Sequence, residues 1–165
     1  MIGLLLNIVL CLLLASIIYQ DFKYRAIHFL LVIGVFAIGT ILLWLDQKSV
    51  LIFLINSVFV LIIMTLLWLY ISIKQHKLTN PFTHNIGIGD VLFFFAITPF
   101  FSLHHYMVFF ISGMILTLLF SLVFKKLISN KLIPLAGILA GFMIFLKGLA
   151  LFIPVNFYDN SYFNI

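Results

Sequence analysis

The sequence predicts an all-α membrane protein, built as a single bundle of six transmembrane helices. Of its 165 residues, 65% are hydrophobic and only 8% are charged. A soluble domain of this length could not bury so much apolar surface. The apolar residues fall into runs of about the ~20 residues that a helix needs to cross a bilayer. We therefore expect one membrane-embedded domain that covers residues 1–165.

The apolar runs and the polar clusters between them set the order of the helices. The fourth helix is expected to be short, because Pro99 interrupts it and the polar residues 102–105 end it. A loop rich in turn-forming residues precedes it, and residues 156–165 form a polar and aromatic tail that we expect to be interfacial or frayed. Six helices are expected, at roughly residues 2–20, 27–45, 49–73, from near Asp90, at 106–124, and from near Pro134 to near Pro154.

Several site classes are not expected in this chain. The N-terminus has no positive charge and no small-residue cleavage site, so it is interpreted as a retained first helix and not a signal peptide. Cys11 is the single cysteine, which excludes an internal disulfide and a cysteine-based metal site. The adjacent His104 and His105 point apart on a helix. We expect neither a metal nor a cofactor.

The net charge of +5 does not indicate a nucleic-acid partner, because the basic residues form short clusters between apolar runs. Lys48 lies in a loop on the other side of the membrane from these clusters, and Lys147 lies inside the sixth helix, where it can extend toward that far face. Under the positive-inside rule, the loops after the first, third and fifth helices are cytoplasmic and both termini are outside. The protein is expected in the cell membrane, as a multi-pass protein. The clustered basic residues are Lys23, Arg25, Lys74, Lys77, Lys125, Lys126 and Lys131.

This topology places two acidic residues at the same depth. Asp21 ends the first helix and Asp90 begins the fourth, both on the cytoplasmic side. On opposite faces they would be separated by the ~30 Å hydrocarbon thickness. A carboxylate at a membrane-spanning segment usually marks function, together with a partner, and here the natural partner of each acid is the other one.

Two adjacent carboxyl groups have the chemistry that peptide hydrolysis needs. Water must lose a proton as it attacks the scissile carbonyl, and the leaving nitrogen must gain one. Repulsion keeps such a pair from ionising fully, so that one carboxyl stays protonated while the other accepts a proton. We expect Asp21 and Asp90 to activate the water jointly and to titrate as a unit.

The glycines before Asp90 fit a site of this kind. Gly87 and Gly89 lack a Cβ, so the backbone can take unusual dihedral angles and a substrate strand can lie close to it. Irregular backbone at membrane depth is tolerated only where it is buried in protein or lines a cavity. We therefore expect both glycines to bind substrate or to support the site.

Three segments resemble a known family, the type IV prepilin peptidases, which include the archaeal preflagellin peptidases. Asp21-Phe-Lys-Tyr-Arg-Ala-Ile27 is similar to the family's Asp-x-Lys/Arg-x-x-x-Ile segment, and Gly87-Ile-Gly-Asp90 to its Gly-x-Gly-Asp motif. Ile133-Pro-Leu-Ala-Gly137 is a weaker likeness to an Ile-Pro-rich turn. The resemblance covers essentially the whole protease part of the family.

The resemblance implies an intramembrane aspartic endopeptidase in which Asp21 and Asp90 are catalytic. It implies that Lys23 helps the site or the docking of the leader peptide. The substrates would be pilin-like or flagellin-like precursors in the bilayer, cut at the cytoplasmic face between a short basic leader and a hydrophobic helix. The chain departs from the family at His28: the family usually continues Ile-Pro-Asn/Asp, whereas this chain has Ile27-His28-Phe29. The cysteine-rich domain of the larger enzymes is missing, so a protease-only form without a basis for N-methylation is expected.

Other interpretations remain open. Asp21 alone could be a helix-flanking charge, Asp90 an N-terminal helix cap, and Lys23 with Arg25 a topology signal. A protease of the presenilin type also carries Gly-x-Gly-Asp, but its first Asp follows Tyr directly, whereas Gln20 intervenes here. A non-catalytic carrier or scaffold that retains the prepilin-peptidase fold is the main alternative. The sequence leaves open which precursor is cut and whether the chain forms a homodimer.

Overall fold

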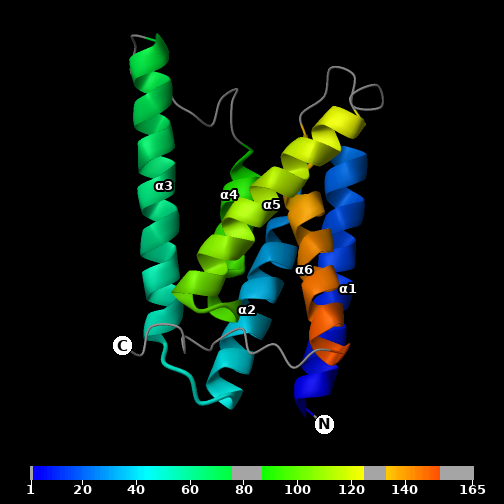
Figure 1. Cartoon of the computed structure of the whole chain (residues 1–165). Helices are drawn as coiled ribbons and strands as arrows, with labels where there is room; N and C mark the ends of the chain where they lie inside the picture. The colour runs from blue at the N-terminus through cyan, green and yellow to red at the C-terminus, as the bar shows by residue number, and fades with distance from the viewer. Residues whose placement is uncertain (1, 76–86, 125–132, 153–165) are drawn as a thin grey trace.

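The computed structural model describes residues 2–75, 87–124 and 133–152, and within these ranges the chain is helical without strands (Figure 1). The predicted all-α class and the six helices are confirmed. The helices are α1 (Ile2–Tyr24), α2 (Phe29–Leu45), α3 (Leu51–Gln75), α4 (Ile88–Ala96), α5 (Leu103–Val123) and α6 (Leu135–Phe152), with a 3-10 turn, η1 (Thr98–Phe100), between α4 and α5.

Three of the six helices are long and apolar enough to cross a membrane. These are α1, α3 and α5, with 18-residue stretches of mean hydropathy 2.6, 2.6 and 2.3. The apolar stretches of α2, of α4 with η1, and of α6 are shorter. Large apolar side chains are exposed along the outside of the bundle, as on Leu4 and Leu66, which suits a surface that faces lipid. The chain is therefore a helical membrane protein.

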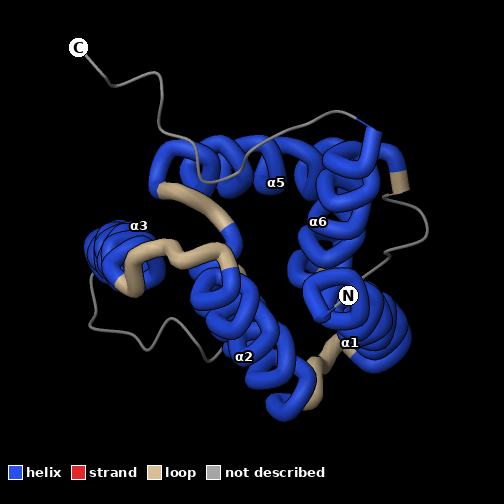
Figure 2. Tube along the Cα trace, turned by 90° about the horizontal axis from the view of Figure 1, so that it is seen from below, coloured by secondary structure: helices blue, strands red, loops and turns tan. Residues whose placement is uncertain are grey.

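The helices form a bundle in which α4 lies among the others. Helix α1 packs against α6 and α2, and α4 contacts α2, α6 and α3. Helix α5 crosses the bundle diagonally (Figures 1 and 2). Near its start, the ring of Tyr106 lies 5.9 Å from that of Phe59 on α3. Near its end, the ring of Phe120 lies 5.8 Å from that of Phe22 on α1.

The predicted break at Pro99 is present, and polar side chains hold it in place. Pro99 lies in η1, which separates the nine-residue α4 from α5. The backbone carbonyls freed by the break accept hydrogen bonds from Asn56 on α3, whose Nδ2 lies 2.9 Å from Thr98 O and 2.7 Å from Phe101 O. Asn56 is completely buried. In an apolar surrounding such carbonyls need partners, so Asn56 fixes α3 to the break.

Some helix boundaries differ from the expected ones. Helix α1 continues to Tyr24, so Asp21 lies inside its last turn and not after it. Arg25 ends the helix with a positive φ of 54°. Helix α5 begins at Leu103, which places His104 and His105 in its first turn. The expected tail at 156–165, most of the loop before Asp90, and the lysines at 77, 125, 126 and 131 lie outside the described residues.

Candidate active site

Asp21 faces the interior of the bundle because of its position on α1. The buried residues of α1 are Leu10, Leu14, Ile17 and Asp21, which recur at the three- and four-residue spacing of one helix face. The side chain of Asp21 is only 6% exposed. An acidic residue that shares the apolar face of its helix must find hydrogen-bond donors in the core.

Asp90 lies in the first turn of α4 and is partly buried. The helix begins after Gly87, which has extended backbone angles. A Cβ at Gly87 would lie 2.8 Å from Oδ2 of Asp90, and a Cβ at Gly89 would lie 3.3 Å from Cδ1 of Ile27. The absence of a side chain at Gly87 therefore leaves room for the carboxylate, and its absence at Gly89 lets α4 approach the start of α2.

The donors for both carboxylates come from the N-terminus of α6. A helix leaves its first amides without partners inside the helix. In α6, Leu135 N donates to Ile133 O at 2.9 Å, and Ile138 N donates to Pro134 O at 3.1 Å. The two amides between them, those of Ala136 and Gly137, are left to donate to groups outside the helix.

Each of these two amides donates to one of the two aspartates. Gly137 N lies 2.6 Å from Oδ2 of Asp21, and Ala136 N lies 3.0 Å from Oδ1 of Asp90. Consecutive Cα atoms are ~3.8 Å apart, so the two carboxylates are held side by side, and each acts electrostatically on the other. Asp21 and Asp90 are 69 positions apart in the sequence, and the structure brings them together. The positive end of the α6 dipole stabilises negative charge at this point.

Gly137 is a site residue that the sequence interpretation missed. A Cβ at this position would lie 3.1 Å from Oδ2 of Asp21 and 3.1 Å from two ring carbons of Phe22. Glycine therefore lets α1 approach the start of α6 closely enough for the short hydrogen bond. The signal that could have located it was the Ile133–Gly137 segment, which predicted a helix start but not which amides would remain unpaired.

Arg25 is also part of this region, although the sequence indicated only a topology signal. Its backbone amide donates to Asp21 O at 3.1 Å, and its guanidinium attracts the Asp21 carboxylate. Its Nη1 is buried and has no hydrogen-bond partner in the described part of the chain. A positive charge therefore lies near the pair of acids.

Lys23 lies on another face of α1. Residues two apart on a helix point about 200° from each other, and Nζ of Lys23 hydrogen-bonds Oη of Tyr19 at 2.6 Å. It also lies 5.0 Å from the ring centres of Tyr19 and Tyr24. The structure does not bring Lys23 to the two acids, and its role in leader docking stays a prediction.

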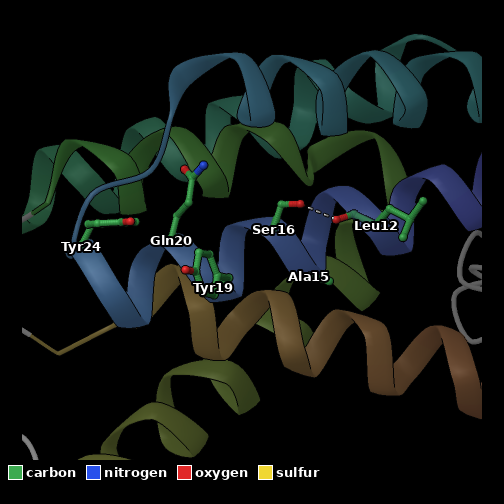
Figure 3. A pocket seen from close by; sticks show the side chains of 6 residues that line it. All are labelled: Leu12, Ala15, Ser16, Tyr19, Gln20 and Tyr24. Atoms are coloured by element: carbon green, nitrogen blue, oxygen red, sulfur yellow. Dashed lines mark hydrogen bonds between the residues drawn. The ribbon is translucent and has the colours of Figure 1, made fainter.

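A shallow groove of about 610 Å³ runs along this outer face of α1 (Figure 3). Leu12, Ser16 and Tyr19 line it, with Gln20 and Tyr24 at the end near α2. The groove faces away from the buried stripe that carries Asp21. It therefore does not contain the two carboxylates.

His28 shapes the turn from α1 to α2. His28 has φ −69° and ψ 125°, which are angles that proline also takes. Its backbone amide donates to Oε1 of Gln20 at 2.9 Å, and its Nδ1 accepts from Leu30 N at 3.4 Å. His28 thus caps α2, and Gln20 ties this cap to the turn of α1 that carries Asp21.

Comparisons of the chain with protein families, with curated proteins and with solved structures find no match. Among the described residues, no group of three or more His, Cys, Asp or Glu side chains could hold a metal ion.

Proposed function

We propose that this protein is an intramembrane aspartic endopeptidase that removes the short basic leader from type IV pilin-like precursors. One observation carries the proposal: Asp21 and Asp90, from two different helices, accept hydrogen bonds from consecutive backbone amides of α6. The resemblance of the segments around both residues to the prepilin peptidases gives the substrate class. The proposed cleavage occurs at the cytoplasmic face, following the distribution of basic residues.

The arrangement supports a specific division of labour between the carboxylate oxygens. Oδ2 of Asp21 and Oδ1 of Asp90 are held by α6, which leaves the other oxygen of each carboxylate to hold a water. One carboxylate takes a proton from this water as its oxygen attacks the scissile carbonyl carbon. The other, protonated, carboxyl donates its proton, and the peptide C–N bond breaks as the leaving nitrogen is protonated. Arg25 limits the cost of the negative charge that remains.

A second candidate is a non-catalytic scaffold or carrier, and one observation favours it. Both hydrogen bonds to α6 are also what ordinary N-terminal capping would provide. In that case the two acids would stabilise the junction of α1, α4 and α6 and do nothing more.

The substitutions Asp21→Asn and Asp90→Asn separate these functions. An asparagine side-chain oxygen still accepts a hydrogen bond from a backbone amide, but the amide group cannot exchange a proton with water. We expect each variant, purified in detergent, to melt within about 2–4 °C of wild type, the shift that ~1 kcal/mol produces in a chain of this size. Each should cut a pilin-like precursor at least ~100-fold more slowly than wild type.

The matched control is Asp46→Asn, because Asp46 follows the far end of α2 and has no part in the proposed chemistry. It should cut at the wild-type rate. Cleavage at that rate by the Asp21 and Asp90 variants would refute the aspartic mechanism. A wild-type protein that cuts none of several pilin-like precursors would favour the scaffold.

A further inference from the structure

Arg25 ends α1 in a backbone conformation that arginine rarely adopts. Its φ is 54°, which lies in the left-handed region that glycine and asparagine take more readily. Its backbone amide donates to Asp21 O at 3.1 Å, one turn earlier. A residue that keeps an unfavourable backbone conformation beside two acids indicates that its side chain has a function there.

The guanidinium of Arg25 is turned into the protein. Its Nη1 is buried and hydrogen-bonds neither carboxylate, so it leaves their oxygens free, while its charge attracts Asp21. The chain has only four acidic residues. Asp46 follows the far end of α2, and Asp159 lies outside the described residues. Within the described structure, the charge of Arg25 therefore acts on the pair formed by Asp21 and Asp90.

The other ionisable groups on the surrounding helices are placed differently. Lys147 comes ten positions after Gly137 in α6, ~15 Å along the helix. Lys23 lies on the outer face of α1 and bonds to a tyrosine, and Lys74 is exposed near the end of α3. His28 is neutral where its Nδ1 accepts a hydrogen bond. The half of α5 that packs against α1 has no ionisable side chain.

The two acids are not equivalent in their surroundings. The Gly137 amide lies 2.6 Å from Asp21, a length typical of a charged acceptor, whereas the Ala136 amide lies 3.0 Å from Asp90. Burial alone would favour the opposite order, because Asp21 is 6% exposed and Asp90 is only partly buried. The cation outweighs this difference, because opposite charges attract more strongly where water is excluded. An ionised Asp21 then opposes a charge on Asp90.

We propose that Arg25 is a positioning residue that keeps Asp21 ionised and so places the shared proton on Asp90. The inference rests on the proposed function and assigns its two chemical roles. Asp21 is the general base, which takes a proton from water as the water oxygen attacks the scissile carbonyl carbon. Asp90 is the general acid, which gives its proton to the leaving nitrogen as the C–N bond breaks. Passage of the proton from Asp21 to Asp90 then restores the starting state.

The first test measures the proton directly and needs no cleavage. The four acidic residues are all aspartates, so carbon-13 labels on aspartate carboxyl carbons give four NMR signals, and the Asn variants at 21 and 90 assign the pair. In the wild-type protein in detergent, the Asp21 signal should change first as the pH rises, and the Asp90 signal second. In Arg25→Gln the two changes should draw together. A wild-type protein in which Asp90 ionises first, or both ionise together, would overturn the proposal.

The second test compares pH profiles of kcat/KM for a precursor that wild type cuts. Without the cation the pair ionises less readily, so both limbs of the Arg25→Gln profile should move to higher pH. On the acidic limb this should lower kcat/KM at least about threefold. Arg25→Lys keeps the charge and should restore the wild-type limbs. Lys74→Gln, which removes an exposed charge, is the matched control and should keep them.

A structural role of Arg25 would lower kcat/KM equally at every pH, and such a result would overturn the proposal. Wild-type limbs in Arg25→Gln would overturn it too, while leaving cleavage by the acids intact. A wild-type protein that cuts no precursor would instead refute the proposed function, and the two catalytic roles with it.

Discussion

Gly137→Ala tests whether the closeness of α6 to Asp21 matters for activity. The new Cβ would lie 3.1 Å from Oδ2 of Asp21 and from the Phe22 ring, so the carboxylate must move by a few tenths of an ångström. A misplacement of ~1 Å can cost about 100-fold in rate, and a shift of this size should therefore cost roughly threefold to tenfold. Alanine also favours a helix by up to ~1 kcal/mol over glycine, which offsets the crowding.

We therefore expect kcat/KM to fall while the melting temperature stays within about 2–4 °C of wild type. The assay is cleavage of a pilin-like precursor in detergent, with thermal unfolding measured on the same preparation. Gly141→Ala, one turn along α6, is the control, because its Cβ would meet only Cδ1 of Ile18 at an ordinary 3.8 Å. Full activity in Gly137→Ala, or an equal loss in Gly141→Ala, would refute the reasoning.

Two further substitutions test the scaffold around the site. Asn56→Leu should destabilise the protein by about 1–3 kcal/mol, because it leaves the buried carbonyls of Thr98 and Phe101 without their donor; an unchanged melting temperature would contradict the role of Asn56 at the break. Gln20→Ala should cost about 0.5–1.5 kcal/mol in wild type and nothing in a His28→Pro background, because proline has no amide to donate. Equal costs in both backgrounds, measured by a double-mutant cycle, would show that the Gln20 contact with His28 contributes nothing.

The helices themselves were predictable from composition. Apolar runs separated by charged clusters located all six helices, and Pro99 located the break, because both signals are local. Counting spans also predicted that Asp21 and Asp90 lie at the same end of the bundle, and the structure brings them together there. Their shared hydrogen-bond partner, the start of α6, could not be predicted, because it depends on which amides of α6 the Ile133–Pro134 turn leaves unpaired.

Two other features could not be read from the chain for physical reasons. A helix with apolar residues on all sides, like α3, has the same sequence pattern whether protein or lipid surrounds it, so the burial of Val60 beside the exposed Leu61 could not be predicted. Asn56 is one of several polar residues in α3, and only the break opposite it explains why it is buried. Arg25 was interpreted from its charge alone, whereas its place near Asp21 depends on α1 continuing for a further turn.

The two hydrogen bonds of Asn56 fix α3 to the break at one point along its length. From Asn56 to Gln75 the helix is ~28 Å long, at ~1.5 Å per residue. A tilt of ~10° about that point would carry its tip by about 5 Å. Such a tilt would move α3 relative to α1 and α6, which carry Asp21 and its hydrogen-bond donor.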